Sequence, residues 1–169
     1  GLLSDKFEEP YEILNRLYEL LTEIDEFLDP SNKNTQNNKS KKNQALKPLE
    51  LKSPSGMIIQ VGRNHRQNEL ISLKKARKGD FWFHVQECPG SHVVLKSSNG
   101  LIEEDDIQLA ADIAAFFSRA KENKVVPIVK VPTEKLKRIQ GALPGTVSYE
   151  KSEVLWGVPH RAIQHIQQK

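Results

Sequence analysis

Cysteine is nearly absent from this sequence: Cys88 is the single one among 169 residues. An intrachain disulfide is therefore impossible, which argues against a small secreted domain held together by such bonds. The sequence also lacks an apolar run long enough to span a bilayer, and its start shows no signal-peptide pattern. These absences predict a soluble, cytoplasmic protein without a membrane partner.

The common catalytic signatures are missing as well. The sequence contains no P-loop, no dinucleotide fingerprint, no HExxH and no GxSxG motif. We therefore expect no enzymatic activity, no cofactor and no metal. One alternative stays open, a metal-dependent nucleic-acid enzyme whose ligands would be His84, His92 and Asp80. Ser91 and His92 are poor candidates for a nucleophile and its base, because adjacent strand residues point to opposite faces.

Charge is distributed unevenly along the chain. Residues 1–30 hold nine acidic residues and two basic ones, whereas the whole chain has a formal net charge of +3. The remainder is therefore basic, with a net charge of +10. A basic body suggests a polyanionic partner, and nucleic acid is the first candidate.

The first 54 residues contain two different segments. Leu14, Leu17, Leu21, Ile24 and Leu28 follow a heptad spacing, which fits either the C-terminal end of a coiled coil, with a possible coiled-coil contact, or an amphipathic helix docked on its own domain. Residues 31–47 are of low complexity and contain five lysines without an acidic or aromatic residue. We therefore predict a helix at 1–30 and a basic linker over 31–54.

The region 55–159 carries the patterns of a folded domain. We expect strands at 57–61 and 125–131, and Pro127 should place the second at an edge or make it irregular. Helices are expected at 67–76 and 103–122, a short helical turn at 134–139, and a hairpin joining 147–149 to 154–156. The residues 160–169 read as a polar tail. The expected class is α+β, a mostly antiparallel sheet with one long and one or two short helices.

The segment 79–96 is the most informative part of this domain. Its residues alternate as in two strands joined by a tight turn, so that one set faces the core: Phe81, Phe83, Val85, Val93 and Leu95. The opposite face would then present an aromatic plane, two imidazoles and a cation, namely Trp82, His84, His92 and Lys96. Such a surface favours binding, although the long helix could instead cover Trp82.

Basic residues lie close to this segment. One group precedes it directly, and a second follows the next expected strand: Arg63, Arg66, Lys74, Lys75, Arg77 and Lys78, then Lys130, Lys135, Lys137 and Arg138. Cations beside an exposed aromatic ring suit single-stranded or looped RNA, where phosphates are neutralised and unstacked bases lie on rings.

Four separated blocks of this region resemble the NFACT-R domain of the NFACT ribosome quality-control family. They are VGRNHRQNEL at 61–70, DFWFH at 80–84, PGSHVV at 89–94 and GALPGTVSY at 141–149. Members of that family are called RqcH in bacteria and NEMF in eukaryotes, and some bacterial members carry the name fibronectin-binding protein. Several motifs in the same order are far more specific than any one of them.

The resemblance implies an RNA-binding domain that follows a coiled coil in a larger protein. Such a protein binds large ribosomal subunits that carry a nascent chain on peptidyl-tRNA, and it recruits tRNA for untemplated alanine tailing. The implied partners are tRNA and large-subunit rRNA. The alternative is an adhesin-like domain that binds fibronectin.

The motifs also imply a set of RNA-binding residues: Gly62, Arg63, Asn64, Arg66, Gln67, Asn68, Asp80, Trp82, His84, Gly90, Ser91, His92 and Lys96. We expect Arg63 and Arg66 to contact phosphate, and Trp82 to stack on a base or ribose. The two histidines would donate hydrogen bonds. Asp80 would orient a neighbouring side chain, because a bare carboxylate repels phosphate.

Overall fold

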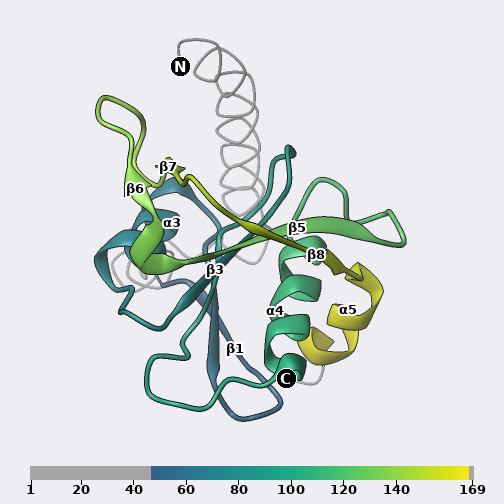
Figure 1. Ribbon diagram of the computed structural model, residues 1–169. Coiled ribbons are helices and arrows are strands. Elements are labelled where there is room, and N and C mark those ends of the chain that lie inside the picture. Colours follow the sequence, from purple (N-terminus) through teal and green to yellow (C-terminus); the bar gives the residue numbers. More distant parts are fainter. Residues whose placement is uncertain (1–46, 168–169) are drawn as a thin grey trace, which may run out of the picture.

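The computed structural model describes residues 47–167, so the predicted N-terminal helix and most of the linker lie outside the described residues. The main sheet has six strands in the order β1-β2-β4-β3-β5-β8 (Figure 1), and every neighbouring pair is antiparallel. The predicted α+β class with a mostly antiparallel sheet is confirmed. No helix within this range has the length and apolarity needed to cross a membrane.

The strands are short and follow the chain closely. The six of the main sheet are β1 (Leu49–Lys52), β2 (Ile58–Val61), β3 (Phe81–Val85), β4 (Val93–Leu95), β5 (Val126–Pro132) and β8 (Glu153–Gly157). A separate two-stranded sheet pairs β6 (Lys137–Arg138) with β7 (Val147–Ser148). The helical elements are α3 (His65–Glu69), the π-helical η3 (Leu70–Lys74), α4 (Glu104–Phe116), the 3-10 turn η4 (Thr133–Lys135) and α5 (Pro159–Gln167).

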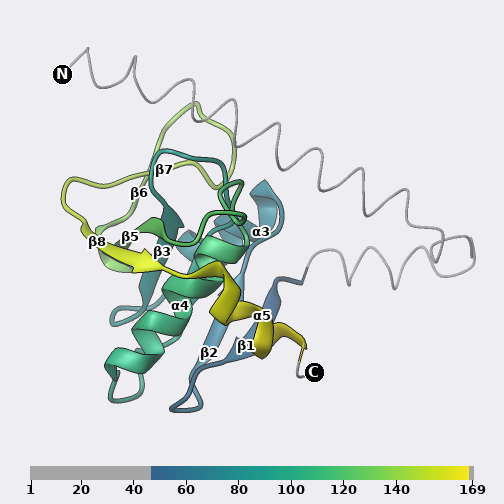
Figure 2. The same ribbon diagram turned by 90° about the vertical axis from the view of Figure 1, so that its right-hand side faces the viewer.

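The larger hydrophobic core lies between one face of the sheet and α4. Phe83 and Val85 of β3 point into it, together with Val93 and Leu95 of β4, as their alternation predicts. A stripe of fully buried alanines lets α4 approach the strands closely, and α5 packs beside α4 (Figure 2). This arrangement places α4 and α5 together on one side of the sheet.

The first turn of the long helix α4 contains a buried carboxylate, Asp106. Asp106 accepts hydrogen bonds from the backbone nitrogens of Ser55 at 2.9 Å and Glu103 at 3.0 Å. Burial raises the pKa of Asp106, but these hydrogen bonds and those from the Ser53 and Ser55 side chains outweigh burial and leave the pKa below its ordinary value. Two chain segments are thereby fixed to the first turn of α4.

The opposite face of the sheet is covered too, by different elements. Trp82 and Val94 point away from α4 and form a smaller core with Ile71 of η3, Val131 of β5 and Leu136. Figure 1 shows α3 and the β6–β7 pair on this side, across the sheet from α4 and α5. The polar chains of β3 and β4 therefore lie under a second layer, which the sequence did not indicate.

Several expectations about the elements are wrong. Residues 49–52 were expected in a loop but form β1, and Leu51 is 5% exposed in the larger core. The expected polar tail contains α5, whose Ala162 is fully buried. The expected hairpin between 147–149 and 154–156 does not form, since β7 pairs with β6 and β8 pairs with β5. The helix expected at 103–122 ends at Phe116.

β5 is an internal strand, contrary to the expectation from Pro127. The Pro127 oxygen accepts a hydrogen bond from the Gln86 nitrogen at 2.9 Å, just beyond the last β3–β5 residue pair. In an antiparallel strand the nitrogen and oxygen of a residue point to the same side, so the missing N–H of proline removes no bond to β8. Trp156 lies opposite Pro127 on β8 and is 62% exposed.

Candidate nucleic-acid interface

The residues after β2 form a compact loop that leads into α3. The Gly62 nitrogen donates to the His92 oxygen at 2.9 Å, which joins this loop to the start of β4. A Cβ atom at Gly62 would lie 2.1 Å from Oδ1 of Asn68, so any larger residue would collide with it. Gly62 therefore serves the close approach of this loop to α3.

The amides of the same loop bind backbone groups. Asn64 caps α3 by accepting a hydrogen bond from the Gln67 nitrogen at 2.9 Å, and Gln67 Oε1 accepts from the Arg63 nitrogen at 2.9 Å. Asn68 Oδ1 accepts from the His92 nitrogen at 3.3 Å. Gln67 and Asn68 are buried, and Asn64 is half-buried. These three predicted site residues are therefore a scaffold.

Both arginines of the loop region are exposed to solvent. Arg63 precedes the helix cap, and Arg66 lies in the single turn of α3. The scaffold beneath them fixes where their backbones lie, while their side chains extend outward. Arg63 and Arg66 are thus exposed, as a contact with phosphate requires, and the contact itself stays a prediction.

The aromatic face of β3 and β4 is buried, contrary to expectation. Trp82 is 2% exposed, His84 9% and His92 8%. The assignment of faces is correct, but α4 does not cover Trp82: the ring packs against the smaller core, and Tyr149 lies over it with ring centroids 5.5 Å apart. The expected stacking of a base on Trp82 is not possible in this arrangement.

The three buried rings form one cluster. Trp82 and His84 stack almost parallel, with centroids 5.4 Å apart, and His92 meets both rings edge-on. The Trp82 nitrogen Nε1 is buried and has no hydrogen-bond partner among the described residues. The ring is therefore held by packing rather than by a polar contact.

The imidazoles have different polar partners. The His84 nitrogens lie 2.6 Å from the Val85 oxygen and 3.2 Å from the Gly90 oxygen, while His92 Nδ1 lies 2.9 Å from the Ser72 hydroxyl. Burial lowers the pKa of His84, although both carbonyls act in the opposite direction. Burial, and then repulsion from His84, lowers the pKa of His92 well below its ordinary value. Both rings are consequently neutral at physiological pH.

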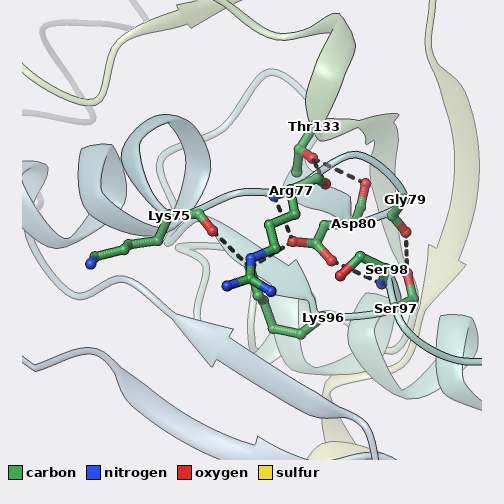
Figure 3. A network of polar contacts seen from close by, with 8 residues as sticks. All are labelled: Lys75, Arg77, Gly79, Asp80, Lys96, Ser97, Ser98 and Thr133. Atoms are coloured by element: carbon green, nitrogen blue, oxygen red, sulfur yellow. Dashed lines mark hydrogen bonds and ion pairs between the residues drawn. The ribbon is translucent and has the colours of Figure 1, made fainter.

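Asp80 and Lys96 form a fixed ion pair just before β3 and just after β4 (Figure 3). The Asp80 carboxylate accepts a hydrogen bond from the Lys96 ammonium. It also accepts hydrogen bonds from the backbone nitrogens of Arg77 at 2.9 Å and Ser98 at 3.1 Å. Lys96 also donates to the Lys75 oxygen at 3.0 Å. Asp80 thus orients a neighbouring side chain, as expected, and the Lys96 charge is neutralised.

The three suggested metal ligands do not converge, although His84 and His92 lie in the same ring cluster. Asp80 is occupied by the contacts just described, whereas His84 and His92 bond to carbonyl and hydroxyl oxygens. Among residues 47–167 no three histidine, cysteine, aspartate or glutamate side chains lie close enough to hold a metal ion.

The turn between β3 and β4 is fastened to the end of α4. The Ser91 nitrogen donates to the Phe117 oxygen at 2.9 Å, and a Cβ atom at Gly90 would lie 2.8 Å from a Val85 methyl group. Gly90 and Ser91 are both buried. Burial also raises the pKa of the neighbouring Cys88 thiol, which makes it a weak nucleophile.

The exposed cations come from segments far apart in sequence. Arg138 of β6 pairs with Glu69 of α3, and a Cβ at Gly145 would lie 2.7 Å from the His65 oxygen, so the β6–β7 arm lies directly against α3. The Thr133 hydroxyl donates a hydrogen bond to the Arg77 oxygen at 3.1 Å. This bond connects the segment 74–78 to the segment 133–138. We call the exposed basic side chains of these segments the basic surface: Arg63, Arg66, Lys74, Lys75, Arg77, Lys78, Lys135, Lys137 and Arg138.

The basic surface unites most of the two groups expected from the sequence, with one exception. Lys130 lies 4.4 Å from the centre of the Phe81 ring and pairs with Glu153. It points to the α4 side of the sheet, because it stands opposite Phe83 in the β3–β5 register. Lys130 is therefore separate from the basic surface.

Comparison with known families gives this surface a context. The family model described as the NFACT protein RNA-binding domain matches residues 47–151. The chain belongs to this NFACT RNA-binding domain family. The match begins just before β1, in agreement with the start of the sheet.

Two bacterial proteins are similar in sequence to this chain. The Rqc2 homolog RqcH of Bacillus subtilis is 38% identical over 133 residues, covering 79% of this chain and 23% of the relative. The Rqc2 homolog RqcH of Streptococcus suis is 38% identical over 103 residues, or 60% of this chain and 18% of the relative. The chain thus spans about a quarter or less of the length of these relatives.

A solved structure resembles the NFACT chain closely. It is the C-terminal part of the fibronectin/fibrinogen-binding protein from Streptococcus suis, at 30% identity and a TM-score of 0.71. The match covers 93% of this chain and 68% of the solved chain.

Sequence reasoning overlooked two residues on this side of the NFACT domain. Tyr149 covers Trp82, and Gln60 lies on β2 with a buried Oε1 that accepts no hydrogen bond from residues 47–167. The alternation of residues 58–61 is too short to show which face Gln60 occupies. Tyr149 was noted as part of a motif, but its contact depends on the path of the β6–β7 arm.

Proposed function

We propose that this NFACT domain binds RNA without catalysis, and that its basic surface contacts the phosphate backbone. The observation that carries the proposal is the convergence of three basic segments over a rigid loop. Glu69 is already paired with Arg138, so it offsets little of the remaining charge. Cations that neutralise phosphates release counterions, which is the main source of sequence-independent affinity for RNA.

The scaffold described above supports this role for Arg63 and Arg66. The capped, hydrogen-bonded loop holds both backbones in place, so less conformational entropy is lost when their side chains bind phosphate. The buried motif residues would then act through position, and the arginines would make the contacts.

The finer proposal concerns the parent protein. Within a ribosome quality-control factor, this domain would bind tRNA or large-subunit rRNA on obstructed large subunits that carry peptidyl-tRNA. The parent would recruit tRNA for untemplated alanine tailing. The similarity to the Rqc2 homolog RqcH of two bacteria supports this assignment. Co-sedimentation of the parent and of this chain with such subunits tests it, and the expected result is that both bind.

The direct test measures the affinity of the chain for tRNA at salt concentrations between about 50 and 200 mM. The logarithm of the affinity should fall linearly with the logarithm of the salt concentration. Replacing Arg66 by Ala should weaken binding and reduce the slope by about 0.7–0.9, the value for one lost phosphate contact. Lys121→Ala is the matched control, because Lys121 is exposed after α4 on another part of the molecule.

Two results would contradict the proposal. Absence of tRNA binding even at low salt would refute RNA binding by this domain. An equal loss in the Arg66 and Lys121 variants would show that net charge matters but the basic surface does not.

A second candidate function comes from the similar solved structure, which belongs to a fibronectin/fibrinogen-binding protein. An interaction domain of that kind would bind fibronectin in the presence of ribonuclease and independently of Arg66. Surface plasmon resonance with immobilised fibronectin distinguishes the two functions.

A further inference from the structure

The outer strand β8 carries an exposed indole ring. Trp156 is 62% exposed, more than any other aromatic side chain in residues 47–167. Its neighbour Leu155 packs against the larger core, so the alternation of the strand places Trp156 and Val154 on the side of the sheet away from α4. Val154 is exposed as well. Exposed apolar side chains that lie together, unlike scattered ones, mark an interaction site.

The surface around Trp156 is apolar and uncharged. On β5, the half-buried Pro127 lies directly opposite Trp156, and Val129 lies opposite Val154. The acidic residue of β8, Glu153, is on the other side of the sheet, where it pairs with Lys130. Within β5 and β8, therefore, no carboxylate on this face repels a polyanion.

The indole lies on the same side of the sheet as the basic surface. Tyr149 follows the β6–β7 arm and lies over Trp82 of β3, and only β5 separates β3 from β8. Neighbouring strands are about 4.8 Å apart, so about 10 Å separates β3 from β8. The arm carries Lys137 and Arg138 of the basic surface, and Figure 1 shows the chain running from β7 directly into β8. A short strand of nucleic acid can thus reach both the cations and Trp156.

The backbone of β8 is not open to an added protein strand along its length. The Pro127 oxygen points toward β3, so the nitrogen and oxygen of its partner Trp156 point away from β5. The Trp156 oxygen accepts a hydrogen bond from Nε2 of Gln108 at 2.8 Å, and the Val158 nitrogen donates to Asp112 at 2.8 Å. Strand addition requires a row of unpaired groups. The ring, and not the strand edge, is therefore the feature available for binding.

We propose that Trp156 is a stacking platform for an unpaired base of an RNA strand whose phosphates lie on the basic surface. Every base has a π face, so an exposed indole binds bases with little regard to sequence. Bases inside a duplex are already stacked on one another, so the ring selects single-stranded or looped RNA. This inference rests on RNA binding as the proposed function and adds a preference for unpaired RNA.

The test compares two labelled probes by fluorescence anisotropy with the intact chain. One is a mixed-sequence twelve-nucleotide RNA without self-complementarity, and the other is the same strand annealed to its complement. Trp156→Thr removes the ring and keeps a residue that favours strands. It should weaken binding of the single strand at least about fivefold, the loss expected when a ring that stacks on a base is removed, and binding of the duplex less than about twofold.

Two further variants serve as controls. Trp156→Tyr keeps an aromatic ring and should bind the single strand within about threefold of the unchanged chain. Leu101→Thr is the matched control, because Leu101 is another exposed apolar residue, 92% exposed in the loop between β4 and α4. It should leave the binding of both probes unchanged.

The salt dependence separates stacking from phosphate contact. Trp156→Thr should leave the slope of the logarithm of affinity against the logarithm of salt concentration unchanged, because the ring contacts a base and releases no counterion. Arg66→Ala should reduce that slope. A reduced slope in the Trp156→Thr variant would overturn the stacking role.

The outcomes also separate this inference from the proposed function. Unchanged binding of the single strand by Trp156→Thr, or an equal loss for single strand and duplex, overturns the stacking site while RNA binding stands. A dimer of the chain in gel filtration that Trp156→Thr disperses would show that a second copy covers the ring, and would overturn it as well. Absence of binding to both probes and to tRNA overturns both proposals.

Discussion

Trp82 shows how far a single residue can be interpreted from sequence. The alternation along 81–85 places it correctly on the face away from Phe83, because the period of two fixes which side chains share a face. Alternation does not tell what covers that face. The covering residues come from η3 and from the segment after β5, and no local pattern connects those segments to β3.

Trp82 is therefore expected to act on stability. Replacing it by Ala should cost about 3–5 kcal/mol of unfolding free energy, as for other large buried aromatic residues, measured by urea unfolding. Trp82→Phe should cost less, since the indole Nε1 has no hydrogen bond to lose within the described part of the chain. The folded Phe variant should bind tRNA with nearly unchanged affinity. A tenfold loss of affinity in that variant would instead implicate the ring in RNA contact.

The buried histidines should make stability depend on pH. Their pKa values are lower in the folded than in the unfolded state, where the ordinary value is about 6.5. Below that pH the unfolded state binds more protons, so stability is intact above about pH 6.5 and falls as the pH decreases toward the folded pKa values. The slope can reach about 1.4 kcal/mol per pH unit for each histidine.

Urea unfolding midpoints at about pH 7.5, 6.5 and 5.5 measure this effect. His92→Asn should flatten the dependence in that window, because one of the two titrating groups is removed. Equal midpoints at all three pH values in the unchanged chain would show that neither imidazole resists protonation. Asp106, whose pKa is also lowered, loses its contribution only at much lower pH, so it does not obscure the result.

At the scale of elements, the sequence predicts those with strong local patterns. The strand at 57–61, the two strands within 79–96 and the start of the long helix are found where expected. β1 was missed because LELK has two apolar residues between prolines, and α5 because its sequence PHRAIQHIQ reads as polar. Both are stabilised mainly by tertiary contacts, through Leu51 and Ala162, which sequence periodicity cannot show.

The last two elements complete the fold although the family match ends at residue 151. A chain cut after Lys151 would lose β8 and α5, leaving β5 as an open edge and removing Leu155 and Ile166 from the larger core. We expect it to lose about 3–5 kcal/mol of stability and to aggregate, as measured by urea unfolding and gel filtration. A monomer with an unchanged unfolding midpoint would show that these elements are accessory.

At the scale of the whole molecule, the two faces of the sheet differ in composition. The α4 side is an apolar core closed by alanines, and the other side combines a small core with hydrogen-bonded loops and cations. The sequence predicted the charge excess and the two basic groups. It could not predict that the segment 133–138 would join Arg63 and Arg66, because that depends on the Arg138–Glu69 pair and on the close approach of Gly145 to α3.

The candidate site was accordingly predicted in part. The motif residues do gather around one loop, but most of them are buried, since amides such as Asn68 bind backbone groups. A match to a motif therefore does not show whether each of its residues contacts a ligand.

The contrast between Trp82 and Trp156 has a spectroscopic consequence. The chain has two tryptophans, one 2% and the other 62% exposed. Emission from Trp82 is blue-shifted and hidden from aqueous quenchers such as iodide, whereas Trp156 emits at longer wavelength and is quenched readily. The imidazoles beside Trp82 become quenchers of its emission when they are protonated. Fluorescence of the unlabelled protein therefore reports separately on the buried ring cluster and on the outer edge of the sheet.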